Sequence, residues 1–377
     1  MATAQLDRER FHFLDGLRGI ASLMIVFHHA FTSSICRWLD GHHLPAAGFY
    51  LRYFTQSGVD LFFVLSGVVL LRPYLRGERK FKTLEYLVRR IKRIYPAYWV
   101  ALLFGALVCG YINDHPNWYN KKVYHMVFYW PEIIREGKII DFIGAYYNLD
   151  WWSLGVEMLF YFLVPLIIII FPRNSALSKS RVLILILGTF IGAAILQIIV
   201  SKHFPDIYST KHLISNSYQI ISYPVCFLMG ILLAARDFSL ADAAKMMLTG
   251  TALIIGSYVY LPLINPGYGL LYAGIITTLF HRQSLRAVLS HPFMIWLGER
   301  SYSLFLVHFS VFYLADSIVA NYFVFGSWQY GLLSRMLGLP LALLVAMMLF
   351  TFVERFQARG LITDKQFWPW QAWKKKN

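Results

Sequence analysis

Charged residues are scarce in this sequence. Asp, Glu, Lys and Arg occupy 15% of its 377 positions, whereas hydrophobic residues occupy 58%, and the mean hydropathy is +0.52. A soluble chain of this length would fold into about two domains, each of which would need a charged surface. Too little charge is present to cover such surfaces, so lipid must be the solvent for much of the chain. The sequence therefore predicts an integral membrane protein.

Cysteine is scarce as well. Cys36, Cys109 and Cys226 form no cluster with the spacing of metal ligands, so no zinc site, no disulfide framework and no metal are expected. Cys36 and Cys109 lie near the predicted outer ends of spans, where a disulfide is conceivable, but a buried free cysteine is the commoner case. A cleavable signal peptide is missing too, because the first ten residues are polar and the apolar stretch after them contains Arg18. We expect that stretch to remain in the mature protein.

Ten apolar segments predict an all-α fold, a polytopic bundle of about ten transmembrane helices. Their approximate ranges are 14–35, 57–71, 94–112, 152–171, 182–200, 218–235, 246–264, 266–280, 302–320 and 331–353. The second and eighth are short for a hydrocarbon core of about 30 Å. Polar residues fill the gaps, and the chain stops soon after the last segment. We expect residues 1–377 to form a single membrane-embedded domain with no appended soluble domain.

Positive charge is distributed unevenly between the segments. The stretch 72–93 carries nine Lys and Arg residues. Placing this stretch in the cytoplasm puts both termini there as well and agrees with an even number of spans. The other predicted cytoplasmic stretches are also basic, whereas the predicted outer ones hold few Lys and Arg. This bias explains most of the net charge of +15 without nucleic acid as a partner.

Ionisable residues inside the spans carry functional information, because an ionisable group in hydrocarbon is costly without a partner or a purpose. Arg18 and His29 are eleven positions apart, which places them on one face of an α-helix and roughly 16 Å apart along its axis. Arg18 can reach the cytoplasmic surface with its long side chain. His29 is predicted to lie past the midplane, toward the outer side. Its neighbour His28 is predicted to be a packing residue.

Two acidic residues fall at a similar depth to His29. Asp60 and Glu157 each lie a few residues into their spans, in the predicted outer half of the membrane. Three ionisable groups at one depth suggest a buried polar site. The alternative is an ion-paired packing cluster at a helix end or, for Asp60, a simple N-terminal cap.

Five motifs resemble those of the acyltransferase family 3 membrane proteins. They are LDGLRGI at 14–20 with His29 eleven positions after its arginine, GVDLFFVLSG at 58–67, RRIKRIYP at 89–96, WSLGVE at 152–157 and GERSYSLFLVH at 298–308. They occur in the order in which the family has them, which makes the resemblance specific. Met158 and Leu159 depart from the family, many of whose members have a second Glu and a Gln or Trp there. Glu157 is therefore the only acid at this place.

The resemblance implies acyl transfer from a cytoplasmic acyl-CoA, usually acetyl-CoA, to a hydroxyl of a sugar or another secondary metabolite. It implies that His29 is catalytic and that Arg18 is required. The expected partners are acyl-CoA, a carbohydrate or lipid-linked glycan acceptor such as a polysaccharide, and membrane lipids. The expected location is the inner (cell) membrane of a bacterium.

The chemistry of the residues agrees with this implication. A hydroxyl is a poor nucleophile until a positioned base takes its proton, and a neutral histidine suits that task near pH 7. Glu157 could orient the imidazole and stabilise its charged form, as the acid does in a catalytic triad. No Gly-x-Ser-x-Gly elbow occurs, and Ser66 is expected in the middle of a helix. We therefore prefer direct transfer to a serine acyl-enzyme, and a covalent intermediate on His29 stays open.

The donor's phosphates need cations, which the stretch 72–93 supplies. Arg89, Arg90 and Arg93 precede the third span, where guanidinium groups suit phosphate. The alternative is that these residues anchor the topology and bind anionic lipid. The earlier cations of the stretch, Arg72, Arg76, Arg79, Lys80 and Lys82, are weaker candidates. His308 could line the donor path or be a packed histidine.

Three further interpretations follow from the placement of these groups. The aromatic stretch 113–150 could stack on sugar rings or form an interfacial belt. A proton-coupled transporter would also place His, Glu and Arg inside a bundle, but the inverted repeats with broken helices typical of transporters are not visible. Finally, cations on the cytoplasmic side and a base in the outer half predict a channel through which the pantetheine arm of the donor reaches inward.

Overall fold

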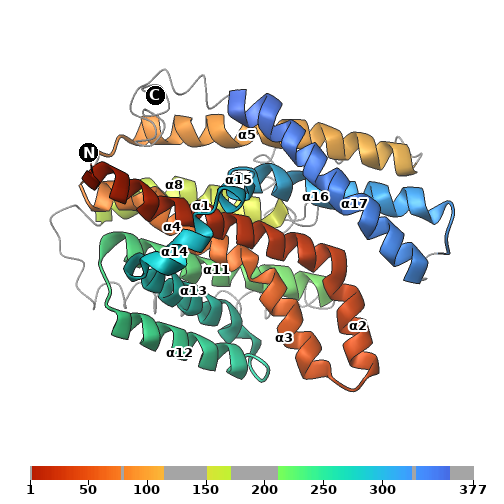
Figure 1. Ribbon diagram of the computed structural model, residues 1–377, viewed down its shortest axis with the longest axis horizontal. Helices are drawn as coiled ribbons and strands as arrows, with labels where there is room; N and C mark the ends of the chain where they lie inside the picture. Colours follow the sequence, from red (N-terminus) through yellow and green to blue (C-terminus); the bar gives the residue numbers. More distant parts are fainter. Residues whose placement is uncertain (1, 78–79, 114–150, 171–210, 325–327, 357–377) are drawn as a thin grey trace, which may run out of the picture. The chain divides into compact units, whose positions relative to one another are not determined.

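The computed structural model describes residues 2–77, 80–113, 151–170, 211–324 and 328–356 (Figure 1). All regular structure within these ranges is helical, which confirms the predicted all-α class. Five helical segments among them are long and apolar enough to cross a membrane. They are His12–Gly41, Pro45–Leu75, Leu261–His281, Ser301–Ala320 and Gln329–Glu354. The count of ten spans and the cytoplasmic location of both termini stay predictions.

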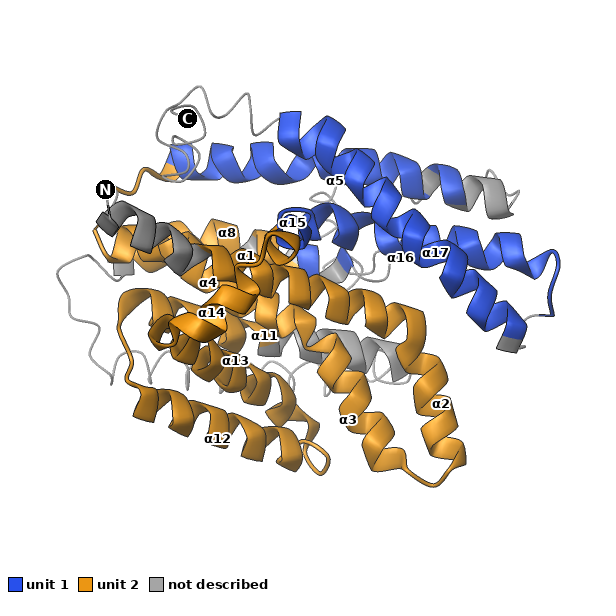
Figure 2. Cartoon of the chain, viewed as in Figure 1, with its two compact units in different colours: residues 1–11, 84–154, 296–377 blue, residues 12–83, 155–295 orange. Residues whose placement is uncertain are grey.

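The chain divides into two compact units (Figure 2). Unit 1 consists of residues 1–11, 84–154 and 296–377, and unit 2 of residues 12–83 and 155–295. Several helices, including α1, α8 and α15, are divided between the two. The units are therefore described one at a time.

The first helix of unit 2 changes its geometry part-way. Helix α1 (Ala2–Phe27) continues without a break into the π-helical segment η1 (His28–Thr32) and then into α2 (Ser33–Gly41). A turn follows in which His43 has a φ of 59°, and α3 (Pro45–Gln56) returns with a proline in its first turn, where no backbone N–H is needed. Helix α4 (Gly58–Leu75) follows at once. The predicted second span, 57–71, is therefore part of a longer helical segment, Pro45–Leu75.

Helix α4 forms the core of unit 2 with α11 (Lys211–Ala235). A methyl group on Gly67 would overlap the carbonyl oxygen of Phe227, and one on Gly230 would overlap that of Val64. The two helices therefore pack backbone to backbone, as small residues permit in membrane proteins. Phe160 of α8 (Trp152–Ile170) stacks on Phe227 with ring centroids 4.4 Å apart.

Three further α-helices complete the described part of unit 2. Helix α12 (Leu240–Gly256) begins at a capping box of Ser239 and Asp242, in which each side chain bonds the other residue's backbone N–H. The 3₁₀ turn η3 (Leu261–Leu263) leads into α13 (Ile264–His281), and α14 (Gln283–Leu289) follows. The cap explains why α12 begins before the predicted span 246–264, and the helix ends at Gly256, before the predicted end.

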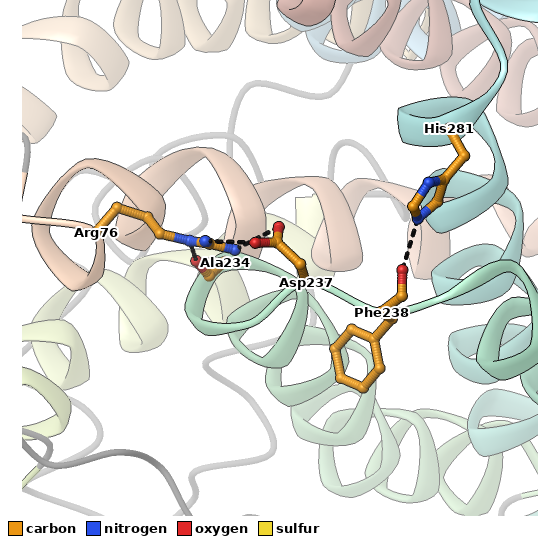
Figure 3. A network of polar contacts seen from close by, with 5 residues as sticks. All are labelled: Arg76, Ala234, Asp237, Phe238 and His281. Atoms are coloured by element: carbon orange, nitrogen blue, oxygen red, sulfur yellow. Dashed lines mark hydrogen bonds and ion pairs between the residues drawn. The ribbon is translucent and has the colours of Figure 1, made fainter.

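Polar contacts fix the turn between α11 and α12 from two sides (Figure 3). At the end of α4, Arg76 donates from Nη1 and Nη2 to the carboxylate of Asp237 at 2.9 and 2.8 Å, and from Nε to the carbonyl oxygen of Ala234 at 3.0 Å. At the end of α13, His281 Nε2 lies 2.6 Å from the carbonyl oxygen of Phe238. These contacts join the ends of α4, α11 and α13.

Unit 1 contains α5 (Thr83–Asn113), α16 (Ser301–Ala320), α17 (Trp328–Leu349) and the π-helical segment η4 (Phe350–Glu354), with the end of α15 (Pro292–Glu299). Trp151 is buried, donates from Nε1 to the carbonyl oxygen of Leu306 at 3.2 Å and lies against Tyr98. Arg335 and Asp316 join α17 to α16 at 3.1 Å.

Most of the predicted spans lie in described helices, but their ends differ. The basic stretch before the third span is helical from Thr83. No glycine or proline lies between Thr83 and Pro96, and Glu85 pairs with Arg89 one turn later. The predicted span 182–200 lies outside the described residues, as does the aromatic stretch 113–150 beyond its first residue.

Candidate active site

His29 lies in the π-helical segment η1 of unit 2. The α-helix is regular from Arg18 to Phe27, so the geometry assumed for a common face of Arg18 and His29 changes only in the last two residues. Single π-helical turns within α-helices occur frequently at functional sites. The half-buried rings of His28 and His29 meet edge to face, with centroids 4.9 Å apart and an angle of 78° between their planes.

The neighbouring His28 has a polar partner. Its Nδ1 lies 2.8 Å from the hydroxyl oxygen of Thr55 on α3, and Thr32 of η1 lies 3.0 Å from the same oxygen. Thr32 and Thr55 are 2% and 3% exposed. The interpretation of His28 as a simple packing residue was therefore incomplete.

Asp60 lies in the first turn of α4 and is 2% exposed. It accepts a hydrogen bond from Asn265 Nδ2 on α13 at 2.8 Å and one from the thiol of Cys226 on α11 at 3.2 Å. The carboxyl group therefore joins three helices and does more than cap its own. One turn earlier, the hydroxyl groups of Ser57 and Tyr272 lie 2.6 Å apart.

Glu157 of α8 belongs to a different cluster of side chains. Its carboxylate accepts a short hydrogen bond from Tyr161, one turn later, and lies 3.5 Å from the hydroxyl of Ser66 on α4. Asp60 belongs to α4, and Glu157 reaches Ser66 roughly two turns later on the same helix, but the two carboxyl groups have different hydrogen-bond partners. Ser66 lies in the middle of α4, as predicted, and its side chain is buried.

Arg18 is half-buried on α1 and has an acidic neighbour one turn earlier. Its Nη1 lies 3.7 Å from a carboxylate oxygen of Asp15. Both residues belong to the predicted motif 14–20, so one turn of the helix carries the cation and its partner together.

The predicted donor-binding arginines lie on α5 in unit 1. Arg89 pairs with Glu85 at 2.8 Å, and the guanidinium of Arg90 lies over the ring of Tyr86, 5.5 Å from its centroid. Arg93 is within electrostatic range of Glu354, at the end of η4. The three arginines therefore lie within two turns of the same helix.

Glu354 is a candidate site residue that the sequence did not predict. Its carboxylate accepts a short hydrogen bond from Ser303 and lies within electrostatic range of Arg300 as well as Arg93. The Arg300 guanidinium lies over the rings of Trp296 and Phe350, 4.6 and 4.4 Å from their centroids. Burial lowers the pKa of Arg300 below its ordinary value, and Glu299 beside it opposes that shift.

His308 of α16 is fully buried. Its Nδ1 lies 3.0 Å from the carbonyl oxygen of Leu304 and 2.9 Å from that of Phe305, and rings of Phe305 and Phe312 lie near it. A carbonyl oxygen only accepts, so Nδ1 carries the proton. Among the described residues no group of three or more His, Cys, Asp or Glu has the arrangement of a metal site.

A family model described as an acyltransferase domain, Acyl_transf_3, matches residues 11–353. The chain belongs to this acyltransferase family. The match includes all the motifs of the resemblance and every site residue predicted from them, and it ends one residue before Glu354. The family and the apolar helices together make the chain an integral membrane protein.

Several relatives share this similarity over most of the chain. A Staphylococcus aureus (strain COL) protein, provisionally named an O-acetyltransferase, is 26% identical over 92% of this chain and 57% of its own length. The peptidoglycan O-acetyltransferase OatA of Listeria monocytogenes is 22% identical over 98% of this chain and 60% of its own length. BcsY of Komagataeibacter xylinus, provisionally named a membrane-bound transacylase, is 26% identical over 91% of this chain and 81% of its own length. This chain thus spans little more than half the length of the first two. No solved structure matches significantly.

The residues that sequence reasoning missed gave signals of different strength. Asn265 was visible as an amide beside a predicted span, while Glu354 fell one residue beyond the predicted last span, 331–353. The bond between His28 and Thr55 joins residues 27 positions apart, and no sequence pattern predicts the π-helical turn.

Proposed function

We propose that this protein transfers an acyl group, in the first instance acetyl, from acyl-CoA to a hydroxyl of a carbohydrate or lipid-linked glycan. The observation that carries the proposal is His29, placed in the opening motif of an acyltransferase family and in a local helix irregularity of the kind found at functional sites. The names of the relatives, which refer to O-acetyltransferases and a transacylase, support the same reaction class.

The proposed reaction is a direct transfer with His29 as the general base. The imidazole takes the proton of the acceptor hydroxyl, whose oxygen attacks the carbonyl carbon of the thioester. The carbon–sulfur bond then breaks, and the leaving thiolate of CoA receives the proton. Glu157 and Asp60 are the proposed supporting acids: each is held by neutral hydrogen-bond donors on helices of the same unit as His29.

The proposed donor-binding residues are Arg89, Arg90 and Arg93 of α5, with Arg18 and His308. Guanidinium groups bind phosphate oxygens in pairs, which suits the phosphates of CoA. With the basic end of α5 in the cytoplasm, the pantetheine arm would reach inward through a channel to His29, while the acceptor arrives from the outer side. The protein would act in this way in the cell membrane of a bacterium, with both termini cytoplasmic, about ten spans and one catalytic domain.

The proposal is tested with the purified full chain in lipid nanodiscs, labelled acetyl-CoA, and peptidoglycan fragments and cello-oligosaccharides as acceptors. We expect labelled product from the wild type and a loss of about a hundredfold or more in His29→Ala, because removing a general base commonly has that effect. His43→Asn is the matched control, since it changes an exposed histidine whose positive φ asparagine tolerates.

A thermal shift on adding CoA is the second measurement, because it reports donor binding without turnover. Near wild-type transfer by His29→Ala would contradict the role of the base. No product from any acceptor together with no stabilisation by CoA would contradict the proposed function as a whole.

A further inference from the structure

The hydroxyl of Thr55 is the meeting point of four polar contacts. Its oxygen lies 2.8 Å from Nδ1 of His28, 3.0 Å from the hydroxyl of Thr32, and 3.0 Å from each of the carbonyl oxygens of Leu51 and Arg52. A hydroxyl has one proton to donate and two lone pairs with which to accept. Thr55 can therefore donate in only one direction, and it must accept in its other hydrogen bonds.

Two of the four contacts are to carbonyl oxygens, which can only accept, and a threonine in a helix commonly donates its hydroxyl proton back to the preceding turn. We infer that the Thr55 proton lies in this shared bond. Both lone pairs of Thr55 are then left to accept, one from the hydroxyl of Thr32 and one from His28. In this assignment His28 carries its proton on Nδ1 and donates it to Thr55.

The consequence reaches His29 through the contact between the two rings. With Nδ1 bound to a buried hydroxyl on α3, the ring of His28 has a fixed orientation, and the ring of His29 packs against it edge to face at 4.9 Å. Catalytic side chains require support of this kind, since small changes in their orientation weaken proton transfer. Thr32, four residues after His28 in η1, reaches the same hydroxyl, so the π-helical turn is tied to α3 at two points.

We propose that Thr55 and His28 are positioning residues for His29: Thr55 fixes the Nδ1-protonated tautomer and the ring plane of His28, and His28 fixes the ring of His29. The inference rests on the proposed function for its effect on rate, but not for the tautomer. It assigns a role to α3 and to the second histidine of the pair.

The test uses Thr55→Val, which keeps the shape of the side chain and removes the hydroxyl. We expect kcat for acetyl transfer to fall about tenfold while the apparent KM for acetyl-CoA stays unchanged, because one hydrogen bond to the positioning imidazole is lost. Thr55→Ser, which restores the hydroxyl, should return most of the rate. Thr278→Val is the matched control, because Thr278 makes the same bond to its preceding turn without contacting an imidazole.

A second readout does not depend on turnover. Solid-state NMR of the [15N]histidine-labelled full chain in lipid vesicles gives the tautomer of His28, assigned by comparison with His28→Gln and His29→Gln. We expect a protonated Nδ1 in the wild type and changed resonances of both histidines in Thr55→Val. A protonated Nε2 with an unprotonated Nδ1 on His28, or unchanged His29 resonances in Thr55→Val, would overturn the inference. So would an unchanged kcat in that variant, whereas failure of the wild type to transfer acetyl would overturn the proposed function alone.

Discussion

The acids of the candidate site have different partners in the two compact units. In unit 2, Asp60 is bound by an amide and a thiol, and Glu157 by a phenol and a hydroxyl, all of them neutral donors. In unit 1, Glu354 lies within electrostatic range of Arg93 and Arg300. Neutral partners suit a site that moves protons, whereas clustered guanidinium groups suit a site that binds an anion. The difference agrees with the proposal that the base lies in unit 2 and that the arginines of α5 in unit 1 bind the phosphates of the donor.

The largest expected effect comes from removing a cation of unit 1, which tests whether that unit binds the donor's phosphates. Arg93→Ala should raise the apparent KM for acetyl-CoA by about 10- to 100-fold, because a hydrogen bond between charged groups contributes about 1.5–3 kcal/mol. The value of kcat at saturating donor should change much less. Initial rates over a range of donor concentrations measure both. Lys92→Ala is the control, since this exposed cation lies beside Arg93 in sequence but outside the proposed set. An unchanged donor KM in Arg93→Ala would show that the arginine only anchors the helix.

A smaller effect of opposite sign is expected from the acid of the same cluster. Glu354→Gln keeps a partner for the Ser303 hydroxyl and removes the negative charge that competes with phosphate for Arg93 and Arg300. The apparent donor KM should therefore fall about threefold, as the loss of one partly screened charge predicts. Isothermal titration with CoA measures the same change without turnover. A weaker affinity would instead mean that the carboxylate is needed to orient the two guanidinium groups.

The sequence predicted more of the fold than of the relations between side chains. Long apolar runs were enough to predict an all-α membrane protein, because ranges such as 302–320 and 331–353 leave no other structure that satisfies the backbone in lipid. The ends of the helices were predicted less accurately: α12 begins after the cap at Ser239 and ends at Gly256, several residues before each end of the predicted span 246–264.

The candidate site shows the same limit. Helix geometry predicted a depth for His29 and Asp60 but not the contacts around them, because Thr55, which bonds the neighbouring His28, and Cys226 and Asn265, which bond Asp60, come from other helices. The π-helical segment at His28–Thr32 also has one more residue per hydrogen-bonded turn than the regular α-helix that the prediction assumed there. Such partners depend on tertiary packing, which a single sequence does not contain.

The smallest expected effect concerns Arg76, a cation of unit 2 that is paired with an acid. Arg76 belongs to the basic stretch 72–93, yet its guanidinium is bound by Asp237 and by the end of α11 (Figure 3). Asp237 is largely exposed, and an exposed ion pair contributes about 0–1 kcal/mol, so Arg76→Ala should lower the melting temperature by only a few degrees. Because the carboxylate already satisfies this guanidinium, the donor KM should stay the same. Asp237→Asn is the matched variant: if the role is structural, it should lower the melting temperature similarly and also leave the donor KM unchanged. A donor KM that rises in Arg76→Ala as much as in Arg93→Ala would mean that Arg76 takes part in phosphate recognition at the end of α4, and its assignment as a structural cation would fail.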